Sequence, residues 1–156
     1  MLNIKRLPPL CTFMVFFFTT YFINAQQINQ FDANKQRTGV WEKYYDNQNI
    51  RYQGQFKKGK EIGVFKFYDE NGSQFPSIIK NFRETTDSVA VEFYLGNGKL
   101  QSKGFFIEKN RVGKWQYFFQ DGKIMSEELY HHGKLAGKLI NFYPNGKPTE
   151  ITHYKN

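Results

Sequence analysis

One short phrase recurs along this chain about every 24 residues, and it limits the possible folds more than any other feature. In each copy a glycine is followed two residues later by a large apolar side chain, then by aromatic residues, and then by a tight-turn dipeptide. The glycine and the second turn residue lie nine positions apart in all four clear copies. The glycines and large apolar residues, which we call the repeat anchors, are Gly39 and Trp41, Gly63 and Phe65, Gly113 and Trp115, and Gly137 and Leu139. A fixed period of this length predicts stacked copies of one supersecondary unit.

The segments between the turns have the composition of β-strands. They are rich in Tyr, Phe, Val, Ile and Trp, and Asn-Gly or Asp-Gly dipeptides separate most of them. Such dipeptides accept positive φ at both central turn positions and are the strongest short-range signal for a β-hairpin. Returning strands are therefore expected at residues 50–56, 100–106, 123–130 and 148–154, and no segment after residue 26 has sustained helical spacing. These patterns predict an all-β fold made of stacked antiparallel β-hairpins.

The array divides into about five units within residues 37–156, and the third unit is degenerate. Ser88 stands where the anchor glycine is expected, yet the phase recovers afterwards. The aromatic residues that close the units are Phe56, Phe82, Phe106, Tyr130 and Tyr154, at steps of 26, 24, 24 and 24. Pro76 interrupts the returning strand of the second unit, and proline cannot donate a hydrogen bond to a ladder. We therefore expect that strand to be an edge strand, bulged or displaced.

The anchors are expected to stack into a continuous apolar spine, because a single hairpin is only marginally stable in water. The anchor glycine has no side chain, so a ring from the neighbouring copy is expected to lie directly against its backbone. The spacing of Trp41 and Tyr44 leaves the strand geometry open, since residues three apart on a regular strand point to opposite faces. Either a bulge intervenes or both faces of the sheet carry aromatic residues.

The first 25 residues have the layout of a secretory signal peptide. Lys5 and Arg6 precede an apolar run of 14 residues at 10–23, and Ala25 offers a small residue for cleavage. The run is shorter than the roughly 20 residues of a spanning helix, although an uncleaved N-terminal anchor is the alternative. Cys11 lies within this segment and is the only cysteine, so the mature chain can form no disulfide. Residues 26–36 are polar and are interpreted as a linker, and the protein is expected in the bacterial periplasm, the outer envelope or the medium.

Basic residues recur at the second set of turns. The formal net charge of +8 becomes +6 when Lys5 and Arg6 are removed, and a surplus of this size favours anionic partners. Export argues against nucleic acid as a partner, so lipid headgroups or acidic polysaccharide are the expected classes. The residues predicted to line one margin of the sheet, here called the basic strip, are Lys57, Lys58, Lys60, Lys109, Arg111, Lys134 and Lys138. The alternative is that these lysines only deter aggregation between sheet edges.

No pattern in the sequence indicates catalysis, a metal site or a cofactor. His131 and His132 are neighbours on an expected strand, so their rings are expected to point to opposite faces, and the same alternation separates Glu127 from Glu128. Acid–base catalysis needs two groups that converge on a substrate. The glycine-rich segment 95–99 opens no helix, so it lacks the context of a phosphate-binding loop and is interpreted as a hairpin turn.

The unit that runs from Gly113 to Lys123, with the sequence GKWQYFFQDGK, resembles the MORN repeat in its bacterial variant form. The whole array, residues 37–154, is also similar to the YwqK-type family, whose members are labelled as antitoxins. The resemblance implies an elongated single-layer sheet of hairpins that acts as a scaffold or as a lipid- or protein-binding module. We therefore expect an exported, non-enzymatic binding scaffold for a protein, a lipid or an envelope glycan. An antitoxin or immunity-type protein with a cognate toxin is the alternative, and the oligomeric state stays open.

Overall fold

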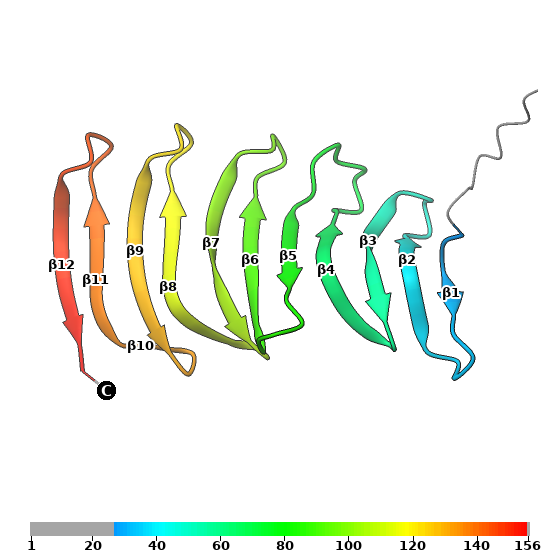
Figure 1. Ribbon diagram of the computed structural model, residues 1–156. Coiled ribbons are helices and arrows are strands. Elements are labelled where there is room, and N and C mark those ends of the chain that lie inside the picture. The colour runs from blue at the N-terminus through cyan, green and yellow to red at the C-terminus, as the bar shows by residue number, and fades with distance from the viewer. Residues whose placement is uncertain (1–26, 156) are drawn as a thin grey trace, which may run out of the picture.

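The computed structural model describes residues 27–155, and these residues form one open antiparallel β-sheet of twelve strands without a helix. The strands follow one another across the sheet in chain order, except that β10 pairs only with β9, which lies between β8 and β11 (Figure 1). The strands are β1 (Gln30–Phe31), β2 (Arg37–Tyr44), β3 (Ile50–Lys57), β4 (Lys60–Phe67), β5 (Ile78–Phe82), β6 (Ser88–Tyr94), β7 (Leu100–Ile107), β8 (Asn110–Phe118), β9 (Ile124–His131), β10 (Lys134–Leu135), β11 (Gly137–Phe142) and β12 (Pro148–Tyr154). The predicted all-β array of stacked hairpins in a single layer is confirmed.

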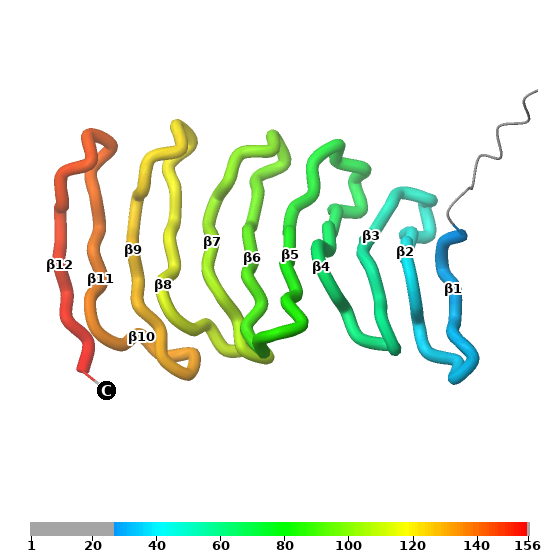
Figure 2. The backbone as a smooth tube through the Cα atoms, in the orientation of Figure 1, coloured from blue at the N-terminus to red at the C-terminus, as the bar shows by residue number. Residues whose placement is uncertain are grey.

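The turns alternate between two long margins of the sheet (Figure 2). The upper margin of Figures 1 and 2 carries the turns that follow β2, β4, β6, β8 and β11, and the lower margin carries those that follow β1, β3, β5, β7 and β9. The upper turns close by short backbone bonds, such as the one from the amide of Gly98 to the carbonyl of Leu95 at 2.8 Å. Residues 95–99 are therefore a hairpin turn, as predicted.

Each anchor glycine lies opposite the aromatic residue that closes the same unit. Gly39 pairs with Phe56 and Gly113 with Tyr130, and the other two anchor glycines pair with Phe82 and Tyr154 in the same way. The two features that recur in the sequence are thus cross-strand partners, and a bulky ring stands beside a residue that has no side chain.

The anchors also place one large side chain over the preceding strand. Lys103 pairs with Gln116 and Phe105 pairs with Val112, so Gly104 alone stands opposite the three residues 113–115. The same bulge in β4 sets residues 63–65 opposite Gly54. The rings of Phe65 and Trp115 emerge from these bulges and are fully buried, as is Val91. Phe56 and Ala136 are buried elsewhere in the same sheet. We call the side of the sheet that carries Phe65 and Trp115 the aromatic face.

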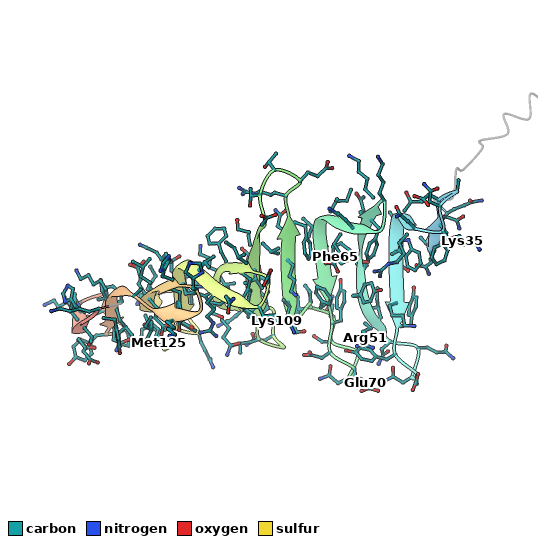
Figure 3. The ribbon with its side chains drawn as sticks, turned by 90° about the horizontal axis from the view of Figure 1, so that it is seen from below. Lys35, Arg51, Phe65, Glu70, Lys109 and Met125 are labelled. Carbon is teal, nitrogen blue, oxygen red and sulfur yellow. The ribbon has the colours of Figure 1, made fainter. Side chains whose placement is uncertain are left out.

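The rings of the aromatic face contact one another along the sheet. Trp115 meets Phe106 edge-on at 5.1 Å between ring centroids and Tyr130 at 6.3 Å. Phe65 meets Phe56 at 5.2 Å and Phe82 at 5.3 Å. Edge-to-face pairs at these distances are favourable beyond the area that they bury. Figure 3 shows side chains on both sides of the sheet, and its N-terminal strands are seen lengthwise while its C-terminal strands are nearly end-on, so the sheet twists along its length.

The structure corrects the expected role of the anchor glycine. A Cβ atom on Gly113 would meet nothing within 4 Å, so no ring rests there. Instead, a Cβ atom on Gly104 would overlap the indole ring of Trp115, and one on Gly54 would overlap the ring of Phe65. The anchor glycine serves the bulge through its positive φ, which is 65° at Gly113. The ring then rests on a different glycine, in the previous unit.

Three further expectations meet the structure in different ways. The strand interrupted by Pro76 was expected to be an edge strand, bulged or displaced. β5 is neither an edge strand nor bulged, because it pairs without a register shift with both β4 and β6, but it is displaced, since it begins only at Ile78, after the proline. Within the expected linker 26–36, β1 pairs with β2, so the sheet begins earlier than the repeat pattern indicates. The register of β2 shifts after Lys43, and the hydroxyl of Tyr44 donates to Glu42, on the face opposite Trp41. A bulge and aromatic residues on both faces therefore both occur.

The predicted signal peptide, residues 1–25, lies outside the described residues.

Candidate functional site

Five residues of the basic strip lie at the lower margin of the sheet. Lys57 ends β3, Lys58 lies in the β3–β4 turn and Lys60 begins β4, so three lysines surround a single turn. Lys109 lies in the β7–β8 turn, where Figure 3 labels it, and Lys134 begins β10. All five are exposed. The strip is therefore densest at the β3–β4 turn and thins toward the C-terminal end.

A groove lies beside this cluster, between the β3–β4 turn and the β5–β6 loop. Its volume is about 510 Å³. Ile62, Phe82 and Val89 supply the apolar part of its wall. The charged residues around it are Lys57, Lys58, Lys60 and Arg83, with Glu61, Glu84 and Asp87 among them. Lys57 Nζ lies 3.0 Å from the carboxylate of Glu84, with both side chains more than half exposed. We call this feature the margin groove.

Arg111 does not belong to the exposed strip, although it was predicted there. Its guanidinium lies over the ring of Trp115, 4.5 Å from the centroid, and Nη1 donates to the hydroxyls of Tyr117 at 2.8 Å and Tyr130 at 3.1 Å. Lys138 is exposed and is the second residue of β11, where it lines a groove with Leu129 and Ile140. Phase along the chain placed Arg111 in the strip, but its side chain is directed onto the ring of Trp115.

The contacts of Arg111 extend into a polar cluster on the aromatic face. The hydroxyl of Tyr130 donates to Glu128 at 2.8 Å. Burial, followed by the charge of Glu128, raises the pKa of Tyr117, and burial with the hydrogen bond to Glu128 raises the pKa of Tyr130. Burial alone would lower the pKa of Arg111, but the bond to Tyr130 and the nearby negative groups outweigh it and raise that pKa. Both tyrosines therefore stay neutral and the arginine stays charged, which fits a structural clamp on Trp115.

Sequence reasoning missed this clamp, although the chain contains a signal for it. Arg37 stands two residues before Gly39, as Arg111 stands two residues before Gly113. The guanidinium of Arg37 lies 3.9 Å from the centroid of Phe56, the closing aromatic residue of its own unit. An arginine at this position thus stacks on the aromatic face in both units that carry one.

The remaining candidate residues do not converge on a reactive site. Trp115 pairs with Glu128 and Gln116 with Glu127, so the two carboxylates point to opposite faces. The rings of His131 and His132 lie 4.2 Å apart between centroids, because the positive φ of 49° at His132 breaks the strand alternation that was expected to separate them. Within residues 27–155, no group of three or more His, Cys, Asp or Glu side chains is placed to hold a metal ion. The same residues contain no helix that is long and apolar enough to cross a membrane.

Comparison with known families supports the repeat interpretation. Three segments, residues 37–58, 111–132 and 135–156, match the family model described as the MORN repeat variant. The matched segments correspond to the hairpins β2–β3, β8–β9 and β11–β12, whereas the hairpins between them are not matched. No curated protein matches the chain. Three hairpins of this β-repeat protein are thus similar to the MORN repeat variant, and their arrangement in one extended sheet is that of a repeat-protein binding scaffold.

Proposed function

We propose that the chain is an exported, non-catalytic binding scaffold, and that its lower margin holds an anionic component of the cell envelope, either an acidic lipid or an acidic glycan. The observation that carries the proposal is the margin groove. Four cationic side chains surround it, namely Lys57, Lys58, Lys60 and Arg83, and its wall includes the apolar side chains of Ile62, Phe82 and Val89. An anionic group with an apolar or ring-like body fits this combination.

The carboxylates around the groove do not prevent this role. Glu84 is already paired with Lys57, and both side chains are exposed. Exposed ion pairs contribute only about 0–1 kcal/mol, so Lys57 can exchange Glu84 for an anionic ligand at little cost. The cations Lys109 and Lys134 extend the same margin beyond the groove. The turns of the upper margin contain the lysines Lys99, Lys123 and Lys147 together with the acidic residues Asp46, Asp69, Glu70 and Asp121, so this margin supplies a matched set of lysines for comparison.

Binding measurements on two variants with equal charge changes test the proposal. The first replaces Lys57, Lys58 and Lys60 by serine, and the second replaces the upper-margin lysines Lys99, Lys123 and Lys147 by serine. Binding is measured by sedimentation with vesicles rich in anionic phospholipid and by retention on an acidic polysaccharide. We expect the first variant to bind at least several-fold more weakly, with a smaller salt dependence, while the second keeps most of its affinity.

The two ligand arms and the control separate the outcomes. Loss on vesicles alone indicates a lipid, and loss on polysaccharide alone indicates a glycan. Equal losses in both variants would mean that net charge, and not the margin groove, governs binding. If the wild type binds neither material, the proposal is wrong, and a protein partner such as a cognate toxin becomes the leading candidate. The export part is checked separately: N-terminal sequencing of the envelope fraction is expected to begin at Gln26.

A further inference from the structure

An unbroken row of side chains crosses the face opposite the aromatic face, here called the ladder face. Each member of the row is the direct cross-strand partner of the next, so all of them share one face. In order from β2 to β12 the row consists of Glu42, Gln53, Lys66, Ile79, Glu92, Lys103, Gln116, Glu127, Ile140 and Ile151. Acidic and basic residues alternate along it.

The neighbouring row on the ladder face carries exposed apolar side chains. Val64, Asn81, Ala90 and Phe105 are successive cross-strand partners in β4 to β7. In β8 the row is occupied by Lys114, whose Nζ lies 3.2 Å from the carboxylate of Glu127 and whose cross-strand partner in β9 is Leu129. Val64 is 48% exposed, Phe105 41% and Leu129 43%. Beside Phe105 lies a groove of about 280 Å³ whose lining includes Ala90, Glu92 and Lys103. Three exposed large apolar residues, Val64, Phe105 and Leu129, thus lie directly beside the charged row.

Each of these two rows is complementary to the same row of a second copy of the chain. A second copy of the chain can face this one about a two-fold axis that is parallel to the strands and midway between β6 and β7. Strand order is then reversed, so β6 faces β7 of the second copy and β4 faces β9. Glu92 meets Lys103 of the second copy, and Lys66 meets Glu127. In the neighbouring row Ala90 meets Phe105, and Val64 meets Leu129. The symmetry repeats each of these pairs once.

We propose that the ladder face is the interface of a face-to-face homodimer with its two-fold axis between β6 and β7. The central groove receives the ring of Phe105 from the second copy, flanked by the Glu92–Lys103 pairs. Two sheets packed in this way lie about 10 Å apart with strands within about 30° of each other. Because the sheet twists, the closest contact is made by the six central strands, β4 to β9, which contain all the pairs named above. At about 4.8 Å between strands and about 25 Å of strand length, they present on the order of 700 Å² per copy, close to the value of about 800 Å² per partner in a stable interface.

The charge pattern also fixes the register of the two copies. A shift of one strand in one direction places Glu92 against Glu92 of the second copy, and a shift in the other direction places Lys103 against Lys103. Like charges in direct contact at an interface cost several kcal/mol, so both shifted arrangements are disfavoured. The arrangement with opposite charges also makes the apolar residues coincide, although the two rows are independent sequences of side chains. A second copy is therefore the occupant that this face fits, and the lower margin stays free in the dimer.

Charge reversal across the axis tests the dimer. We expect the wild-type chain to have the mass of a dimer by size exclusion with light scattering. Glu92→Lys places like charges in both central pairs, and so does Lys103→Glu, so each variant alone is expected to be monomeric. An equimolar mixture of the two variants restores opposite charges in both pairs, because residue 92 of one chain faces residue 103 of the other. The mixture is therefore expected to recover the dimer.

Two controls separate the interface from the fold. Glu42 lies in the same row and accepts a tyrosine hydroxyl from two residues later, as Glu92 does, but it meets Ile151 in the dimer. Glu42→Lys is therefore expected to leave the dimer intact. Phe105→Gln is expected to weaken the dimer at least tenfold while the fold is retained, as circular dichroism checks. A wild type that is monomeric throughout the micromolar range would overturn the proposal, and so would single reversals that stay dimeric or a mixture that stays monomeric.

Discussion

The indole ring of Trp115 lies against the backbone of Gly104, so closely that a methyl group on this glycine would overlap the ring. Its Nε1 donates to the carbonyl of Phe105 at 3.2 Å, which ties the ring to the strand beneath it. Phe65 and Gly54 make the same ring-on-backbone contact two units earlier in the chain. The repeat therefore uses two glycines for different purposes. The anchor glycine opens the bulge from which the ring emerges. The other glycine, here called the receiving glycine, lies in the preceding unit, and the ring covers its backbone.

Substitution of the receiving glycine is expected to destabilise the sheet. In Gly104→Ala the new methyl group displaces either the Trp115 ring or the strand, and overpacking of this kind costs about 1–3 kcal/mol. Gly96→Ala is the matched control, because a Cβ atom there would meet nothing within 4 Å. Chemical denaturation is expected to show a lower free energy of unfolding for Gly104→Ala and a change within about 0.5 kcal/mol for Gly96→Ala. Equal effects would contradict the ring-on-backbone contact.

Substitutions of the anchor glycine are expected to be costly for a different reason. Gly113 has a φ of 65° and open space around its Cα atom, so backbone conformation and not volume limits this position. Alanine in this region costs about 1–2 kcal/mol, whereas asparagine adopts it more readily. The free energy of unfolding is therefore expected to fall in the order Gly, Asn, Ala, Val. If the larger asparagine destabilised more than alanine, crowding would be the cause and the structural assignment would be wrong.

The period, the hairpins and the single sheet could be predicted from local sequence signals. Asn-Gly and Asp-Gly turns fix where each hairpin reverses, and the anchors fix the phase. The receiving glycines could not be found in this way, because the ring that covers Gly104 comes from a residue eleven positions later in another strand. Only the register across the bulge brings the two together. One signal was present: Gly54 and Gly104 each stand two residues before a closing aromatic residue.

In the candidate site, too, the sequence predicts the position of a residue in the repeat but not the direction of its side chain. Recurrence in the sequence correctly indicates that Lys58 and Lys109 lie in turns at one margin. It does not reveal that Arg111 turns toward Trp115 and the hydroxyls of Tyr117 and Tyr130, because these partners occupy three other positions of the repeat. The ladder row is also hidden, since bulges change the number of residues between its members from strand to strand. Side-chain direction depends on register, which local patterns do not specify.

Tyr94 is expected to ionise at unusually high pH. Burial, together with its hydrogen bond to Glu92 and the charge of that carboxylate, raises its pKa to about 12 from 10.0. A raised pKa in the folded state means that the unfolded chain releases this proton first. The stabilising contribution is therefore complete below pH 10 and is lost as the pH rises toward 12. Alkaline unfolding curves are expected to fall less steeply over this range in Tyr94→Phe than in the wild type. Identical slopes would mean that the Tyr94 hydroxyl has an ordinary pKa.

Removal of the last hairpin is expected to weaken the array without abolishing it. Within residues 27–155 each strand pairs only with its neighbours across the sheet, so residues 137–155 pair directly with β9 and not with the first hairpins. A chain that ends at Ala136 leaves the outer side of β9 exposed, and its free energy of unfolding falls by the lost interface and the lost unit. Circular dichroism is expected to show a folded β-protein with a lower unfolding midpoint. Complete unfolding of the truncated chain would indicate long-range cooperation that the one-dimensional contact pattern does not contain.

The contact between Trp115 and Gly104 is also expected to appear as coupling between two substitutions. Trp115→Leu removes buried ring surface and is expected to cost about 2–4 kcal/mol on its own. Gly104→Ala is costly because the ring is in the way, so it is expected to be much less costly once the ring has been replaced by leucine. The last junction of the chain shows that leucine at the anchor tolerates a side chain beneath it, because Leu139 lies over a strand that carries Glu128 in place of glycine.

A double-mutant cycle in chemical denaturation measures the coupling. The double variant is expected to be more stable than the sum of the single effects by about 1 kcal/mol or more, since contacting residues give interaction energies of about 0.5–3 kcal/mol. The same cycle with Gly96→Ala in place of Gly104→Ala is expected to be additive within about 0.5 kcal/mol. If both cycles were additive, the Trp115 ring would not rest on Gly104, and the two-glycine account of the repeat would have to be abandoned.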